Sequence, residues 1–313
     1  MSAEVQILTA FAIDLYLGDP VTKFHPVSLI ASLALFAENK TRPIFCNSKT
    51  AGIVAVGFVL FAVVAVTGLL VNVAYSFGEF TGGIVSVFIL YSSFALKSLA
   101  DHAKAVYEAL ATGDMALAKQ KVGMIVGRDT ANMDEKDIVT ACVESVAEST
   151  VDGVTAPIFY AIIAGPVGVM AYKAVNTMDS IFGHKNEKYI HFGWAAARLD
   201  DVANYVPARI TAFMFVVSAF LLGKGGVRTF WAIVLDGAKS ESPNSGLVEA
   251  GMAGALGVAL GGRRSYGGVK TVAPVKGTGF NAITCKTLPE AIKVSTVSSV
   301  LFLAVLLAVF AKF

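Results

Sequence analysis

Long uncharged stretches alternate with short polar segments along the chain. Apolar residues fill 51–71, 80–96 and 294–311 without one charged side chain. Stretches of about 20 apolar residues are long enough to cross the hydrocarbon core of a bilayer. A shorter apolar run before residue 222 is followed by a Gly-Lys-Gly-Gly turn and a second apolar segment, which predicts a helical hairpin. We therefore predict membrane spans near 51–73, 80–97, 207–222 and 294–311.

The apolar run 154–172 is different, because Pro157 and the pair Gly165-Pro166 interrupt it. Proline lacks a backbone N–H and breaks a helix, so this run predicts a broken helix that is buried or re-entrant. Small residues within 251–262, among them Gly254, Gly257 and Gly261, predict a close approach between helices.

Basic residues give the predicted orientation. The segment 72–79 carries no Lys or Arg, whereas the opposite flanks of the first two spans hold Lys40, Arg42, Lys49, Lys97 and Lys104. Loops rich in Lys and Arg stay on the cytoplasmic side. The expected fold class is therefore all-α, a polytopic helical bundle in the cell (inner, cytoplasmic) membrane with cytoplasmic polar helices and loops. We expect residues 1–313 to form a single membrane-embedded enzyme domain.

Composition agrees with a membrane protein. Hydrophobic residues make up 55% of the 313 residues and charged residues 15%, against about 25% charged in a soluble domain. The net charge of +2 gives no support for a nucleic-acid partner. Cys46, Cys142 and Cys285 lie far apart, without the spacing of a disulfide framework or a zinc site.

Three acids at four-residue spacing precede the broken helix. Glu144, Glu148 and Asp152 fall on one stripe of a helix, where like charges repel each other. Facing lipid, they would cost on the order of 10 kcal/mol, so they face water, basic partners or a metal ion. A solvated helix face is one interpretation. We favour the other, a Mg²⁺ site made of hard oxygen ligands.

The remaining polar residues are grouped, and the predicted active-site segments lie near 14–28, 125–153, 173–209 and 240–268. Arg198 and Arg209, with Asp and Asn nearby, fit either recognition of a phosphate or carboxylate or an internal ion-pair network. His25 is either a loop-packing or a functional residue. No GxxxxGK[ST] loop occurs, so a bound nucleotide needs another arrangement.

These segments resemble the signatures of the cobinamide-phosphate synthase (CbiB/CobD) family. In order along the chain they are LGDPVTKFHPV, GRDT, ESVAESTVDGVTAPIFYA, AYKAVNTMDSIFGHKNEKY, FGWAAARLDDVANYVPARI, SPNSG and SYGG. The resemblance implies an enzyme of cobalamin biosynthesis, an adenosylcobinamide-phosphate synthase that forms a C–N bond. It would join aminopropanol or ethanolamine O-phosphate to the free propionate of adenosylcobyric acid, a corrinoid, with ATP as cosubstrate and Mg²⁺ as cofactor.

Under this hypothesis, each group of polar residues has an expected role. Glu144, Glu148 and Asp152 would hold Mg²⁺ on the triphosphate. Asp179, Asp200 or Asp201 would take the amine proton, and Arg198 and Arg209 would clamp the phosphate or the reacting carboxylate. Phosphate charge would be neutralised by Arg128, Lys173 and Lys185, and corrin amides would be bound by Asn176, Asn204, Ser242 and Asn244. The family signatures add further binding candidates, which are Asp19, His25, Asp129, Thr130, Asn186 and Tyr266.

Two other classes of protein remain open. Discontinuous helices and intramembrane polar residues are also typical of a transporter, here of a corrinoid or a small anionic solute. Acidic helices would equally suit a Mg²⁺-dependent membrane transferase acting on a lipid diphosphate. The sequence does not decide the oligomeric state.

Overall fold

The computed structural model describes residues 1–20 and 25–310. Within these residues the chain is helical apart from a two-stranded antiparallel sheet, which confirms the predicted fold class. The predicted segment 14–28 includes residues 21–24, and the predicted span 294–311 ends at residue 311, so both reach outside the described residues. The chain packs as two units, described separately below. That they act as a single enzyme domain stays a prediction.

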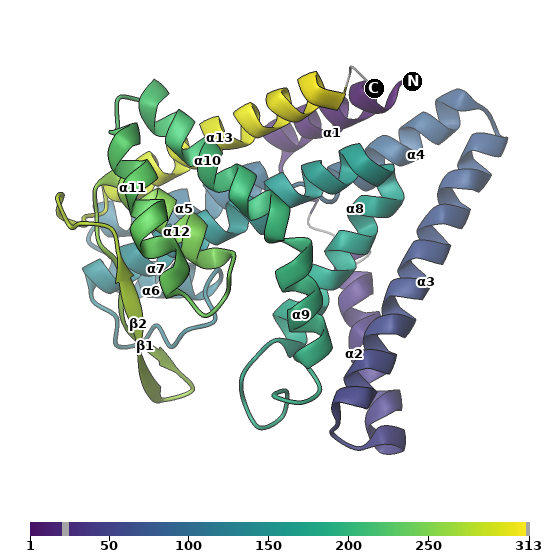
Figure 1. Ribbon diagram of the computed structural model, residues 1–313, viewed down its shortest axis with the longest axis horizontal. Coiled ribbons are helices and arrows are strands. Elements are labelled where there is room, and N and C mark those ends of the chain that lie inside the picture. The colour runs from purple at the N-terminus through teal and green to yellow at the C-terminus, as the bar shows by residue number, and fades with distance from the viewer. Residues whose placement is uncertain (21–24, 311–313) are drawn as a thin grey trace. The chain divides into compact units, whose positions relative to one another are not determined.

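The first unit comprises Met1–Ala95, Asp152–Asn204 and the chain from Leu306. Its helices are α1 (Ala3–Leu17), α2 (Pro26–Phe45), α3 (Lys49–Ser76), α4 (Glu79–Tyr91), α8 (Ala156–Phe182) and α9 (Trp194–Ala203). Helices α2 and α3 run side by side (Figure 1), and α8 packs against α2, α3, α4 and α9. A π-turn, η1 (Val151–Thr155), leads into α8.

Helix α8 is interrupted, as the sequence predicts. Ala164 (φ −140°, ψ 20°) and Gly165 (φ 57°, ψ −149°) leave the helical conformation just before Pro166. Gly165 is needed because a side chain rarely adopts a positive φ. The break therefore comes from the Gly-Pro pair.

The loop 183–193, between α8 and α9, meets the turn between α2 and α3. Arg42 Nη2 donates to the Lys188 carbonyl oxygen at 2.9 Å. Gly52 on α3 permits this approach, because a Cβ there would lie 1.9 Å from the Phe192 carbonyl oxygen. The basic flank of the first predicted span thus adjoins loop 183–193. That both face the cytoplasm stays a prediction.

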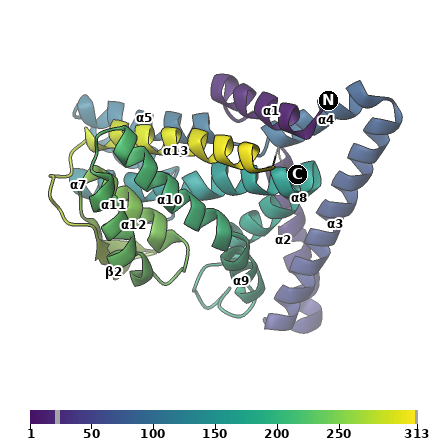
Figure 2. The ribbon, with the colours of Figure 1, turned by 45° about the horizontal axis from the view of Figure 1, so that its top comes forward.

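The second unit comprises Leu96–Val151 and Tyr205–Val305. Its helices are α5 (Leu96–Ala111), α6 (Met115–Gly123), α7 (Glu135–Thr150), α10 (Tyr205–Leu221), α11 (Gly226–Asp236), the short η2 (Gly237–Lys239), α12 (Ser245–Leu256) and most of α13 (Thr287–Phe310). Helices α10 and α11 form the predicted hairpin and both pack on α12 (Figures 1 and 2). Gly254 allows close packing, since a Cβ there would lie 2.7 Å from Thr229 Cα. Gly257 instead ends α12 with φ 69°, and Gly261 lies in the sheet.

The sheet was not predicted. Strands β1 (Leu260–Tyr266) and β2 (Val269–Lys276) form an antiparallel hairpin beside α12. Its turn residues, Gly267 (φ 55°) and Gly268 (φ 83°), both have positive φ. A two-residue turn of this kind matches the twist of a hairpin and favours a Gly-Gly pair.

By length and composition, four helical segments can cross a membrane, namely Lys49–Ser76, Glu79–Ala111, Glu135–Phe182 and Thr287–Phe310. The pair Trp194–Ala203 and Tyr205–Leu221, bent by 48°, gives a fifth if it forms one span. Each predicted span overlaps one of these segments within the described residues. Glu135–Phe182 differs from the expectation, because 154–172 was predicted to be buried or re-entrant rather than part of a continuous candidate span.

Candidate functional site

A polar cluster in the first unit joins η1, α8 and α9. Asn204, directly after α9, is buried and donates from Nδ2 to Asp152 Oδ1 at 3.1 Å and to Asp200 Oδ2 at 3.0 Å. Its own Oδ1 accepts from the Tyr172 hydroxyl at 2.9 Å. One amide therefore fixes two carboxylates that would otherwise repel each other. We call Asp152, Tyr172, Lys173, Asn176, Asp200 and Asn204 the Asp152 cluster.

Helix α8 supplies the cationic and amide members of the Asp152 cluster. Lys173 is buried, and its Nζ lies 3.4 Å from the Asp152 carbonyl oxygen. Asn176, three residues further and on the same helix face, donates to Asp200 Oδ1 at 3.3 Å. The cluster thus combines carboxylates, which accept protons, with an ammonium group that offsets their charge.

Aromatic rings close one side of this cluster. The rings of Tyr160 and Tyr172 stack with centroids 5.1 Å apart. The Tyr160 hydroxyl donates to the Ala203 carbonyl oxygen at 3.0 Å, which ties α8 to the end of α9. Tyr172 thus belongs both to this ring stack and, through its hydroxyl, to the Asp152 cluster.

The other predicted residues of the first unit lie near this cluster or outside it. Asp179 and Asp19 act electrostatically on cluster members, Asp179 on Asp200 and Asp19 on Lys173. Arg198 is exposed and forms a 3.5 Å ion pair with Asp201. That contact fits the ion-pair interpretation for Arg198.

The loop residues His25, Lys185 and Asn186 have other surroundings. His25 Nδ1 accepts from Val27 N at 3.3 Å at the start of α2, and its Nε2 lies 2.9 Å from Asp19 Oδ1. These contacts fit the loop-packing interpretation for His25. Asn186 Oδ1 accepts from Tyr189 N at 3.0 Å and stabilises a turn in loop 183–193, where Lys185 is exposed.

A second polar cluster lies in the second unit. Glu144 on α7 is 1% exposed and forms ion pairs with Arg128 and with Arg264 Nη2, the latter at 2.8 Å. Burial disfavours the charged guanidinium, yet the Glu144 and Glu249 carboxylates together outweigh it and hold the pKa of Arg264 above its ordinary value. We call Arg128, Glu144, Glu148, Glu249, Arg264 and Lys276 the Glu144 cluster.

Its other half is a buried ion pair beside a second acid. Glu249 on α12 and Lys276 on β2 are both almost fully buried and paired. Glu148 forms a hydrogen bond with Glu249. Burial raises the pKa of Glu249, but the Glu148 hydrogen bond and the Lys276 ammonium outweigh it and the net pKa is lowered. Glu148 and the Glu249–Lys276 ion pair thus form one connected polar group.

Asp129 joins two of the sequence motifs. Its carboxylate accepts from Ser265 Oγ at 2.7 Å and from the backbone N–H groups of Gly267 and Gly268 at 3.1 and 2.8 Å. The Ser265 hydrogen bond, followed by those of the glycines, lowers the pKa of Asp129. Asp129 therefore anchors the hairpin turn to the GRDT loop. The adjacent candidates Thr130 and Tyr266 are partly exposed and exposed, respectively.

The carboxylates do not gather as a metal site. Among residues 1–20 and 25–310, no three His, Cys, Asp or Glu side chains lie together as a ligand group. That Glu144, Glu148 and Asp152 together hold Mg²⁺ stays a prediction, to be weighed against the partners that Glu144 and Glu148 already have. Glu144 faces two guanidinium groups and Glu148 bonds Glu249. The π-turn that begins at Val151 ends the four-residue register before Asp152.

Arg209 is also bound internally. Its guanidinium lies 3.3 Å from the Tyr205 ring centroid, and Nη1 donates to Asn244 Oδ1 at 3.2 Å and to the Tyr205 carbonyl oxygen at 2.7 Å. Ser242 Oγ accepts from Asn244 N at 3.3 Å and caps the turn before α12. These contacts agree with an internal network around Arg209, although hydrogen bonds rather than an ion pair form it.

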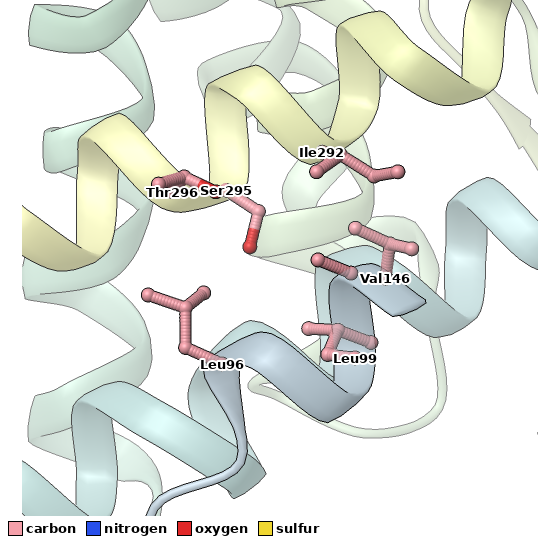
Figure 3. A pocket seen from close by; sticks show the side chains of 7 residues that line it. Leu96, Leu99, Val146, Ile292, Ser295 and Thr296 are labelled. Atoms are coloured by element: carbon pink, nitrogen blue, oxygen red, sulfur yellow. The ribbon is translucent and has the colours of Figure 1, made fainter. Parts of the chain in front are cut away.

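The second unit also has an apolar recess, whose lining contains no ionisable side chain. Figure 3 shows it between α5, α7 and α13. The Ser295 hydroxyl is already hydrogen-bonded to Thr150 at 2.7 Å. Its lining residues are Leu96, Leu99, Ala100, Val146, Ile292, Ser295 and Thr296.

Sequence reasoning missed Tyr172, Glu249, Arg264 and Lys276. A signal existed for Glu249, a lone acid within the apolar segment GLVEAGMAGAL, because such residues need a partner. Nothing local pointed to Lys276 or Arg264, whose partners lie 27 and 120 residues away.

The apolar helices and buried ionisable clusters define a multi-pass membrane protein with polar chemistry built between its helices. Residues 7–295 match the family described as CobD/Cbib protein. The chain is 41% identical over 295 residues to the cobalamin biosynthesis protein CobD of Leptospira interrogans serovar Lai, with 94% of each chain covered. It is 42% identical to that of Clostridium perfringens (87% of each chain) and 37% identical to that of Listeria monocytogenes serovar 1/2a (96% of this chain, 98% of the relative). No solved structure matches.

The chain thus belongs to the CobD/Cbib family, and its role is in cobalamin biosynthesis.

Proposed function

We propose that this protein is an adenosylcobinamide-phosphate synthase at the cytoplasmic face of the cell membrane. It joins the amine of aminopropanol O-phosphate, or of ethanolamine O-phosphate, to the free propionate of adenosylcobyric acid with consumption of ATP. Family membership supports the pathway. The observation that carries the chemistry is the Asn204 amide, which holds the carboxylates of Asp152 and Asp200 together beside Lys173.

The reaction needs activation of one substrate and deprotonation of the other. A carboxylate and an ammonium group do not condense at neutral pH. In the proposed sequence a propionate oxygen attacks the γ-phosphorus of ATP, and ADP leaves. The neutral amine then attacks the acyl phosphate carbon, inorganic phosphate leaves, and the amine nitrogen loses its proton to a base.

We assign the proton acceptor to Asp200. Two amides, Asn176 and Asn204, hold its two oxygens in fixed directions, which is how a general base is kept at its working geometry. Both amides are already bonded to carboxylates, so they position the base rather than contact the corrin. Lys173 would offset the negative charge of an incoming phosphate or carboxylate.

Exposed cations are proposed to receive the anionic substrate groups. Arg198 and Lys185 lie on the surface of the same unit as the Asp152 cluster, which makes them accessible to a phosphate. Arg128 and Arg209 are bound internally, and we assign them structural roles.

The three acids Glu144, Glu148 and Asp152 do not fit a resident magnesium ion, because two arginines neutralise Glu144. We propose that Mg²⁺ enters with the nucleotide, as part of the substrate, and we route no step through a protein-bound metal.

The test is product formation by the purified protein in phospholipid nanodiscs. The protein is incubated with adenosylcobyric acid, ATP, Mg²⁺ and aminopropanol O-phosphate, and the corrinoids are analysed by mass. We expect the mass of adenosylcobinamide phosphate, formed only when ATP is present. Asp200→Asn should lower turnover by at least about a hundredfold, and Asp201→Asn, next to it but paired with Arg198, much less. No product with either amino-alcohol phosphate would refute the proposal.

The break in α8 is the one observation that favours a transporter, since discontinuous helices line many transport sites. Corrinoid uptake into proteoliposomes without any new corrinoid mass would support that function instead.

A further inference from the structure

We infer that the surface formed by the end of α2, the start of α3 and loop 183–193 binds the headgroups of anionic phospholipids. We call this the basic surface, and define it by Lys40, Lys49, Lys188 and Trp194. The inference does not depend on the proposed reaction.

The basic surface is built on a rigid base. Arg42 joins its two segments, with donors to Glu38 Oε1 at 2.8 Å, to Asn47 Oδ1 at 2.5 Å and to the Lys188 carbonyl oxygen at 2.9 Å. Its guanidinium also lies 4.4 Å from the Phe192 ring centroid. Glu38 is buried and pairs with both Arg42 and Lys188, whose Nζ lies 3.5 Å from Glu38 Oε1, so the Glu38 charge is compensated within this surface.

Charge is concentrated on this surface. Residues 38–49 and 184–194 contain five basic and two acidic side chains, a net charge of +3, whereas the whole chain carries +2. A surface with this excess of positive charge attracts an anionic partner.

Exposed aromatic and apolar side chains accompany the lysines. Lys49 Nζ lies 5.0 Å from the ring centroid of Trp194, which is 40% exposed. Ile44 and Ile190 are also exposed, 71% and 48% respectively. Lys and Trp together are typical of the membrane–water interface, where the ring lies at headgroup level.

The position along the chain fixes the partner as a lipid. The candidate span Lys49–Ser76 begins at Lys49, so the basic surface lies where this span leaves the hydrocarbon core. Free phosphate compounds share the phosphate chemistry, but they would not use exposed isoleucines beside it. A phospholipid satisfies the cations and the apolar side chains at once.

Quenching of Trp194 by brominated lipids tests the inference. Trp231→Phe removes the second tryptophan of the chain and leaves Trp194 as the reporter. Brominated phosphatidylglycerol or phosphatidylcholine is titrated into the protein in neutral detergent. We expect saturable quenching by phosphatidylglycerol at concentrations about tenfold lower or more than by phosphatidylcholine, from several basic residues near the surface.

Variants and a competitor complete the design. Lys40→Gln with Lys49→Gln should weaken phosphatidylglycerol quenching about tenfold or more, whereas Lys104→Gln with Lys136→Gln, exposed lysines of the other unit, should not change it. Equal quenching by the two lipids, or full displacement of phosphatidylglycerol by glycerol 3-phosphate, would overturn the inference. If the first variant does not fold, the comparison of the two lipids on the parent protein still decides.

Discussion

Replacing Glu144 by Gln would remove the counter-charge of two arginine side chains. Glu144 is 1% exposed, and the side chains of Arg128 and Arg264 are 12% and 16% exposed. Breaking a buried ion pair by removing one partner costs about 3–5 kcal/mol, because the other charge stays buried without compensation. We expect Glu144→Gln to lower the free energy of unfolding by an amount in this range. Because two arginines lose their partner, the upper end of the range is favoured.

Glu108 provides a matched control. It is 61% exposed and lies 3.6 Å from Lys104 one helical turn away. Such surface pairs contribute about 0.2–1 kcal/mol, so Glu108→Gln should be nearly silent. Both variants are unfolded with guanidinium chloride in detergent micelles and followed by circular dichroism. Linear extrapolation to zero denaturant gives their free energies of unfolding.

Magnesium separates the ion-pair explanation from the metal-site prediction. Because Glu144 already has two arginine partners, Mg²⁺ should not change the free energy of unfolding of the parent protein. A loss below about 1 kcal/mol for Glu144→Gln, or a parent protein stabilised by Mg²⁺ while the variant is not, would refute the reasoning.

Three further predictions follow from single contacts. Asn204→Ala should lower kcat by roughly tenfold to a hundredfold, since each hydrogen bond to a charged group contributes about 1.5–3 kcal/mol; unchanged turnover in the corrinoid mass assay would contradict the positioning role. Gly52→Ala should destabilise the protein by about 1–3 kcal/mol because its Cβ would meet the Phe192 backbone, whereas Gly57→Ala on the same helix, with nothing within 4 Å, should be neutral or slightly stabilising in the same unfolding assay. Asp129 has a folded-state pKa below its ordinary 3.8, so its contribution to stability is present above about pH 4 and is lost as the pH falls through the folded-state pKa; hydrogen exchange of the 260–276 hairpin should show this loss in the parent protein and not in Asp129→Asn.

Much of the fold follows from local sequence patterns. The predicted spans, the break at Gly165-Pro166 and the hairpin of α10 and α11 each depend on residues that are contiguous in the sequence. The sheet at 260–276 escaped prediction because Gly-rich, basic strands lack the alternation of a half-buried strand. Its Gly267-Gly268 turn was the available signal.

The candidate site was less predictable, because pairing between distant segments decides it. The sequence identified most members of the Asp152 cluster by residue type, yet it could not show that Asn204 bridges two carboxylates 52 and 4 residues away. It also assigned Asp129 and Arg209 to ligands, whereas the structure gives both internal hydrogen bonds. Polar side chains of this kind look identical in sequence whether they bind a substrate or the protein itself.

The row formed by Glu144, Glu148 and Asp152 presents a local electrostatic conflict. Three carboxylates at four-residue spacing repel each other, and each has a different solution. Guanidinium groups compensate Glu144, Glu148 forms a hydrogen bond with Glu249, and the Asn204 amide holds Asp152. Of these, only Asp152 lies with a second carboxylate, Asp200, that side-chain amides rather than a basic side chain hold in place. A base must keep its affinity for a proton, and a guanidinium partner would reduce that affinity. This difference between the partners is why we place proton transfer in the Asp152 cluster and structural stabilisation in the Glu144 cluster.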